Sequence, residues 1–266
     1  DRLPGNAQMS MIKQSFILLS GILLAITACP LHAEEAKSGY EYIKPATRAM
    51  QDDDFENPGM LSVERGLELF NEKQDGSGKA CSDCHGADAR EMDPKSIARY
   101  PVYDENRGGI VTLQKSISYC RNNIGSEPLP TNHPDLVALE TFVRNRAHGE
   151  AVNVQVDGPM AALLAQGEKF YQTRYGLIDM SCSHCHSLYP GQMIRGQRIS
   201  QGQGNGFPAY RLDIGEITNL HQRIQQCLTL MRAEPFDADS EEIKLLGLYL
   251  MSRSNGLGIE TPAVRY

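Results

Sequence analysis

The sequence has no surplus of positive charge and no long apolar run beyond its N-terminal region. Its 266 residues carry 26 Lys and Arg against 33 Asp and Glu, a formal net charge of -7. Proteins that bind nucleic acid need clustered basic side chains to displace the counterions of phosphates, so this class is excluded. A membrane-spanning protein needs an apolar stretch of about 20 residues, and no such stretch follows the N-terminus.

Strand patterns and low-complexity tracts are also scarce. Hydrophobic residues make up 41% of the chain and charged residues 22%, which is typical of a globular protein. The glycine-rich stretch at 202–206 lacks the Lys and Ser/Thr of a phosphate-binding loop, so it predicts an ordinary loop.

The N-terminus has the features of a secretory signal peptide. Lys13 precedes an apolar run from Phe16 to Ile26, and small residues follow up to Ala33. We expect residues 1–33 to be removed and the mature protein to be exported to the periplasm. The alternative is lipoprotein processing before Cys29, which would leave that cysteine lipid-modified.

Four of the seven cysteines lie in two short motifs of the form C-x-x-C-H, the signature of covalent c-type haem attachment. One helical turn places both thiols under the haem vinyl groups and presents the following imidazole to the iron. The sequence therefore predicts two haem c groups, with His85 and His186 as proximal ligands. The alternatives are zinc sites or two small disulfides, neither of which requires the histidines. The motif His184 is expected to face solvent. The attachment residues are Cys81, Cys84, His85, Cys182, Cys185 and His186.

The regions around the two motifs repeat. Gly66 precedes Cys81 at the same distance at which Gly167 precedes Cys182. Further on, an i, i+3, i+4 apolar stripe at Leu139, Phe142 and Val143 matches one at Leu246, Tyr249 and Leu250, which predicts a closing helix in each half. The predicted fold is all-α, with two tandem cytochrome c-like domains that each bind one haem, at residues 34–155 and 156–266.

The sixth iron ligand is expected to differ from the methionine of many electron carriers. Cys120 and Cys227 occupy matching positions of the repeat, each seven residues before Glu-Pro, and each is a candidate distal ligand. A Cys120–Cys227 disulfide is the alternative. Competing ligands for the second haem are Met231, Met193, His221 and His133.

The second half carries a charge that the first half lacks. Arg223 lies four residues before Cys227, on the same face of a predicted helix, and Ser116 occupies the matching position. A guanidinium there could hold a small oxyanion against the sulfur, with Arg232 assisting. The alternative is a solvated surface charge.

From Gly66 to the closing helix, the chain resembles the SoxA family of bacterial sulfur oxidation. The resemblance is most specific in Arg223–Cys227, Met231–Pro235 and Phe207–Arg211. It implies an L-cysteine S-thiosulfotransferase that joins thiosulfate oxidatively to a cysteine of the carrier protein SoxYZ and passes two electrons to a soluble cytochrome c. It also implies a monohaem partner, SoxX, with Cys227 as haem ligand, persulfide-forming and catalytic residue and Arg223 as binder of the substrate anion.

Two other functions fit the same motifs. A thiosulfate dehydrogenase would couple two thiosulfates to tetrathionate without a carrier protein. A plain dihaem electron carrier would have no use for Arg223.

Overall fold

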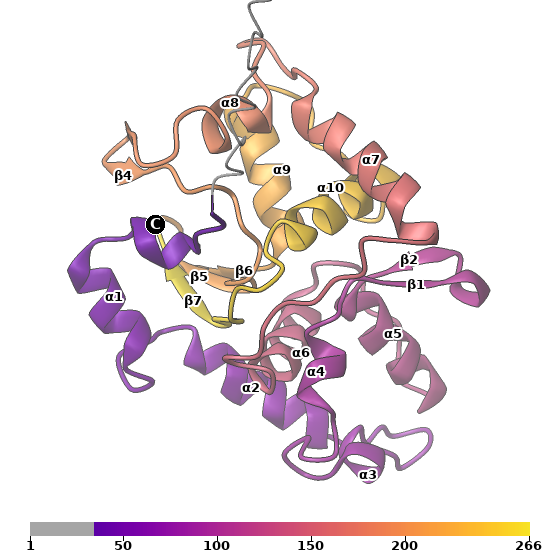
Figure 1. Cartoon of the computed structure of the whole chain (residues 1–266). Helices are drawn as coiled ribbons and strands as arrows, with labels where there is room; N and C mark the ends of the chain where they lie inside the picture. The colour runs from indigo at the N-terminus through magenta and orange to yellow at the C-terminus, as the bar shows by residue number, and fades with distance from the viewer. Residues whose placement is uncertain (1–34) are drawn as a thin grey trace, which may run out of the picture. The chain divides into compact units, whose positions relative to one another are not determined.

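The structure is a computed structural model that describes residues 35–266, and the predicted signal peptide and Cys29 lie outside the described residues. Most regular structure is helical, as predicted (Figure 1). The helices are η1 (Gly39–Tyr42), α1 (Pro45–Asp52), α2 (Met60–Asn71), α3 (Ser82–His85), α4 (Pro94–Ile97), η2 (Glu105–Arg107), α5 (Leu113–Asn123), α6 (Pro134–Asn145), α7 (Pro159–Gln172), α8 (Cys182–His186), α9 (Leu220–Leu230) and α10 (Glu241–Ser252).

In the first half, α2 packs across α6, and Gly66 is the point of closest approach. A Cβ on Gly66 would lie 2.3 Å from the backbone oxygen of Ala138, so only glycine allows the two backbones to come this close. One turn further along, the Phe70 and Phe142 rings pack with centroids 5.2 Å apart, and both side chains are buried. The helix before the motif and the closing helix thus form the frame of this half.

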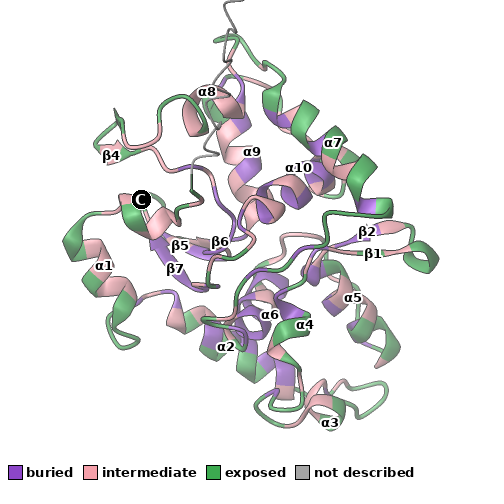
Figure 2. Ribbon diagram, viewed as in Figure 1, coloured by how far each residue is buried: buried purple, intermediate pink, exposed green. Residues whose placement is uncertain are grey.

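The second half repeats this crossing with α7 and α10. A Cβ on Gly167 would lie 2.3 Å from the Leu245 backbone oxygen, and the Tyr171 and Tyr249 rings are again 5.2 Å apart. Buried residues gather along α6, α10 and the strand at the C-terminus (Figure 2). The repeat seen in the sequence is therefore a repeat of helix packing.

Seven short strands depart from the purely helical prediction. β1 (Val102–Asp104) and β2 (Gly109–Val111) form an antiparallel hairpin, and β5 (Ala209–Arg211) and β6 (Glu216–Thr218) form its counterpart in the second half. β7 (Ala263–Arg265) adds to β5 in parallel, and β3 (Met193–Ile194) pairs with β4 (Gln197–Arg198). The strands have at most three residues, too few for a sequence alternation to show. The fold is mostly helical with small hairpins.

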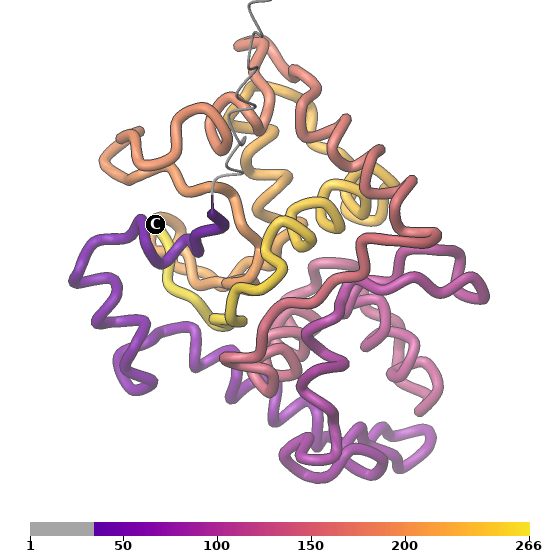
Figure 3. Tube along the Cα trace, in the orientation of Figure 1, coloured from indigo at the N-terminus to yellow at the C-terminus, as the bar shows by residue number. Residues whose placement is uncertain are grey.

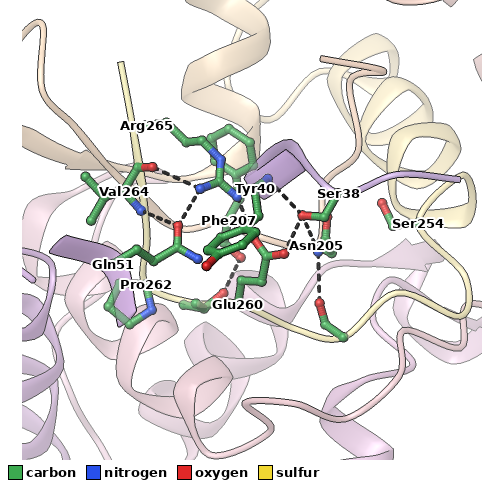
Figure 4. Close-up of polar contacts among 12 residues, drawn as sticks. Ser38, Tyr40, Gln51, Asn205, Phe207, Ser254, Glu260, Pro262, Val264 and Arg265 are labelled. Carbon is green, nitrogen blue, oxygen red and sulfur yellow. Dashed lines mark hydrogen bonds and ion pairs between the residues drawn. The ribbon is translucent and has the colours of Figure 1, made fainter. Parts of the chain in front are cut away.

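The segment before α2 runs beside the C-terminal strand (Figure 3) and is joined to it by partly buried polar contacts (Figure 4). Arg265 donates through Nη2 to Oε2 of Glu260 at 2.5 Å and through Nη1 to Oε1 of Gln51 at 2.5 Å. Ser38 donates to the other oxygen of Glu260, and Nδ2 of Asn205 donates to Oγ of Ser38 at 3.2 Å. Through Asn205, this network holds the loop at 202–207 in place. Gly202 of the same loop lies against His186 of the second haem motif.

The segment just before the predicted domain boundary at 155/156 pairs with the chain that follows α10. The amide of Val152 donates to the oxygen of Leu257 at 2.9 Å, and the amide of Ile259 donates to the oxygen of Glu150 at 2.9 Å. The two halves are thus joined by backbone hydrogen bonds as well as by the chain. No helix within residues 35–266 is long and apolar enough to cross a membrane.

Candidate functional site

The second C-x-x-C-H motif forms the short helix α8, which presents the His186 ring to the interior of the second half. Nδ1 of His186 lies 2.8 Å from the backbone oxygen of Ser200. A carbonyl oxygen only accepts, so Nδ1 donates in this contact and Nε2 is the nitrogen available to a metal, as in histidines that ligate metals. Gly202, with φ of +75°, lies against the ring, where a Cβ would be 3.0 Å from Cγ of the imidazole. The glycine-rich loop therefore positions the histidine.

Cys227 approaches the same imidazole from the helix α9. The helix begins at the N-cap Asn219, whose side chain accepts from the amide of Gln222, so its register is fixed at the end nearest β6. Cys227 lies two turns along, where its thiol is hydrogen-bonded to His186. The structure thus brings His186 and Cys227 together, and their role as iron ligands stays a prediction.

Two arginines surround the Cys227 sulfur. Burial alone would raise the pKa of the thiol, but the positive charge of Arg223, the hydrogen bond with His186 and the positive charge of Arg211 outweigh it, and the pKa falls to about 7. The Arg223 side chain is held by a contact of 3.3 Å from Nη1 to Oε1 of Gln226. Arg223, Arg211 and His186 therefore stabilise a negative charge on the Cys227 sulfur or on a group beside it.

Sequence reasoning did not single out Arg211, although it belongs to the quoted Phe207–Arg211 segment. It lies at the end of β5 and is 4% exposed, and among the described residues its Nη2 has no hydrogen-bond partner. Burial and the neighbouring Arg223 lower its pKa to about 10. Asp104 occupies the matching position of β1, so a comparison of the two hairpins could have revealed a second charge change between the halves.

The competing ligands and the assisting residue lie elsewhere. Met231 is buried in the apolar core behind α9, and Met193 is 57% exposed on β3. Burial lowers the pKa of His221 to about 4, and that ring lies against Gly247. Arg232 is exposed and is not among the groups that shift the pKa of Cys227.

The other two histidines considered, His133 and His184, cap the N-termini of helices. His133 caps α6, where its Nδ1 accepts from the amide of Asp135 at 3.2 Å. His184 caps α8 through its contact of 3.2 Å with the amide of Ser181. The expectation that His184 simply faces solvent therefore missed its capping contact.

The first motif forms α3, with Cys120 of α5 beside it. Burial raises the pKa of Cys120, the nearby Arg107 lowers it, and Cys84 raises it again, so thiol and motif lie close together. His85 packs near Phe70, with ring centroids 6.2 Å apart. The first half thus also has an arginine, Arg107, near its cysteine. Arg107 comes from the turn of the β1–β2 hairpin, and its Nε pairs with Oδ2 of Asp104 at 3.2 Å.

The cysteines of the described residues are all free thiols, so the Cys120–Cys227 disulfide is not formed in the structure. Within residues 35–266, no three His, Cys, Asp or Glu side chains converge as a protein-only metal site would require. Two thiols and an imidazole on one helical turn, opposed by a third cysteine sulfur, are instead the donors for a covalently held haem. Arg211 pairs through Nε with Asp213 at 3.4 Å, and its buried Nη2, which has no partner among the described residues, also fits an anionic group beside the second site. Fold and donor set define a c-type cytochrome.

Comparison with known proteins places the chain more closely. The SoxA/TsdA cytochrome c domain family matches residues 65–152 and 166–259, one segment in each half. The chain is 36% identical to the L-cysteine S-thiosulfotransferase subunit SoxA of Rhodovulum sulfidophilum, over 94% of this chain and 89% of that protein. It is 37% identical to the subunit of the same name from Paracoccus pantotrophus, over 86% and 79%. The crystal structure of SoxXA from P. pantotrophus is similar in fold, with a TM-score of 0.79, 36% identity and 86% coverage of each chain. The chain belongs to the SoxA family, whose cytochrome c domain implies haem c.

Proposed function

We propose that this chain is the SoxA subunit of an L-cysteine S-thiosulfotransferase. The reaction joins the carrier thiolate R–S⁻ of SoxYZ to the outer sulfur of thiosulfate and gives R–S–S–SO₃⁻ and two electrons, which pass to a cytochrome c acceptor. The observation that carries the proposal is the Cys227 sulfur, opposed to His186 and flanked by Arg223 and Arg211. Relatives that share this chain's length and fold bear the enzyme's name.

The residues of the second site divide the work by their chemistry. His186 and Cys227 would hold the iron, and Cys182 and Cys185 would form the thioethers; the haem, when bound, supplies the one-electron steps. Arg223 would bind the thiosulfate dianion and offset its repulsion from an anionic sulfur. Cys227 would also relay sulfur, as a persulfide. Arg211, buried and without a full set of partners, supports the same concentration of positive charge.

We propose a second haem in the first half, so that the chain comprises two cytochrome c domains, 34–155 and 156–266. Cys81 and Cys84 would attach it, and His85 and Cys120 would be its ligands. The repeated helix crossing and the match of the family to both halves support this. The first haem would act as a structural element or electron reservoir.

Haem attachment tests this count. Replacing Cys81 and Cys84 by alanine should leave one haem per chain, and replacing Cys182 and Cys185 should leave the other. Because thioether formation needs only the local motif, each pair is expected to act alone. The pyridine haemochrome absorbance per chain, combined with intact mass, measures the number. A wild-type chain with a single haem would contradict the two-domain proposal.

The protein is proposed to work outside the cytoplasm and with partners. Export by the N-terminal signal would place it in the periplasm, where C-x-x-C-H thiols are joined to haem. The solved complex of the P. pantotrophus relative carries the name SoxXA, which supports a heterodimer with a SoxX-type cytochrome here. SoxYZ, thiosulfate and a soluble cytochrome c complete the set.

Low-temperature electron paramagnetic resonance of the ferric protein tests the ligand assignment. The wild type should give low-spin signals typical of thiolate ligation, and Cys227→Ala should lose one set of these signals. Cys120→Ala is the matched control and should lose the other set only. Methionine- or histidine-type signals that neither substitution changes would return the protein to the class of plain electron carriers. Product analysis with and without SoxYZ separates the transferase from a tetrathionate-forming dehydrogenase.

A further inference from the structure

A cavity of about 270 Å³ lies between α5, the β1–β2 hairpin and the segment that leads into α10. Two of its lining residues, Arg107 and Arg121, also lie near the cysteines of the first haem site. The α5 residues that line it are on the side of the helix away from Cys120. Neither the six cysteines of the described residues nor His85 and His186 line it. Figure 1 shows the β1–β2 hairpin next to α5, and residues of both line the cavity. The proposed reaction has no use for this cavity.

The cavity is positively charged in a chain whose net charge is -7. Four cationic side chains line it, and the one carboxylate in the lining, that of Asp239, already accepts a hydrogen bond of 2.5 Å from Thr131. Lys244 pairs with Glu241 at 3.6 Å, so the other three cations carry the argument. The lining residue His221 is neutral near pH 7, because burial lowers its pKa to about 4. The cations are Arg107, Lys115, Arg121 and Lys244.

Arg121 is the buried member of this group. It is 9% exposed, its Nη2 donates to the backbone oxygen of Glu127 at 3.3 Å, and its Nε has no partner among the described residues. It forms no ion pair with a described carboxylate. A buried guanidinium is costly without a counter-charge. The cavity beside it is where a counter-charge can enter.

Two further cations that line the cavity, Arg107 and Lys115, contact the same aromatic ring, that of Tyr119. The guanidinium carbon of Arg107 lies 4.9 Å from the centroid of the Tyr119 ring, and Nζ of Lys115 lies 5.5 Å from it. Asp104 pairs with Arg107, but Lys115 forms no ion pair with a described carboxylate. Both cations therefore lie within reach of one ring and of the cavity that they line, where an anion could contact both.

We propose that this cavity binds a small divalent oxyanion of the sulfate or thiosulfate type. Arg121 is the buried donor, and Arg107 and Lys115 complete the positive wall. Guanidinium groups bind tetrahedral oxyanions through paired N–H donors, and the cavity leaves room for the anion and bridging waters. The site is distinct from the anion-binding role of Arg223 and does not rest on the proposed reaction.

Isothermal titration of the haem-loaded protein with sulfate, at constant ionic strength set with chloride, tests the proposal. The wild type should bind one sulfate per chain, and thiosulfate should compete for it in the Arg223→Ala background. Arg121→Gln should weaken binding about tenfold or more, because it removes a charged hydrogen-bond donor. The double variant Arg107→Gln/Lys115→Gln, which changes only exposed residues, should weaken it to a similar extent. Arg174→Gln, at an exposed ion pair outside the cavity, is the matched control and should bind like the wild type.

Absence of saturable sulfate binding by the wild type would overturn the proposal. So would unchanged binding by the double variant, which decides the question even if Arg121→Gln does not fold. Loss of sulfate binding in Arg223→Ala would assign the anion to the haem site instead and would also overturn it.

Discussion

The Arg223→Ala variant is expected to turn over thiosulfate about a hundredfold or more slowly than the wild type while keeping its covalent haem. Arg223 lowers the pKa of the Cys227 thiol more than any other group does. A dianion that approaches this sulfur without the guanidinium meets an anionic or electron-rich atom in a partly buried site. Removing one member of such a charge pair costs several kcal/mol, so a loss of two orders of magnitude or more follows. Steady-state reduction of a cytochrome c acceptor, with SoxYZ and thiosulfate present, measures it.

Controls separate this role from a general effect of charge. Arg223→Lys keeps the charge but loses the forked geometry, and it should recover only part of the activity. Arg232→Asn is the matched control, because Arg232 is exposed, does not act on Cys227, and has φ of +57°, which asparagine tolerates. Its activity should match the wild type. If Arg223→Ala kept most of its turnover with normal haem content, Arg223 would be a surface charge.

Local motifs predicted most of the candidate site. C-x-x-C-H needs only one helical turn, and the position of Cys227 relative to Glu-Pro repeats that of Cys120. Both features depend only on spacing along the chain, so they can be predicted without knowledge of the tertiary structure. The opposition of His186 and Cys227 follows from the repeat, and the structure has it. What each residue does there remains a prediction for the experiments above.

Residues brought in by tertiary structure escaped prediction. Arg211 reaches Cys227 because β5 runs beside α9, and Arg107 reaches Cys120 through the turn of the β1–β2 hairpin. Neither strand has more than three residues, so no periodic pattern marked them. The contact of Gly202 with the His186 ring likewise depends on the course of a loop. Motif spacing along the chain does not predict such tertiary contacts.

The sequence repeat aligned Gly66 with Gly167, but it did not show why glycine is needed at these positions. Gly66 and Gly167 align in sequence, and an alanine at either position would be favoured by helix propensity by about 1 kcal/mol. In the folded protein, alanine is instead expected to be destabilising at both positions, because its Cβ would lie 2.3 Å from a backbone oxygen of the crossing helix. A backbone atom cannot move aside as a flexible side chain can, so the helices must separate.

We therefore expect Gly66→Ala and Gly167→Ala each to lower the free energy of unfolding by about 3 kcal/mol or more, at the upper end of what overpacking costs. Gly76→Ala is the matched control, because a Cβ there meets nothing within 4 Å, and its stability should stay within about 0.5 kcal/mol of the wild type. Urea unfolding of the haem-loaded proteins, followed by circular dichroism, gives the three values. Wild-type stability in Gly66→Ala would mean that the helices can shift apart freely, and the close crossing would then not be what holds each haem-binding half together. Loss of stability in Gly76→Ala as well would point instead to a general intolerance of the chain to substitution at glycine.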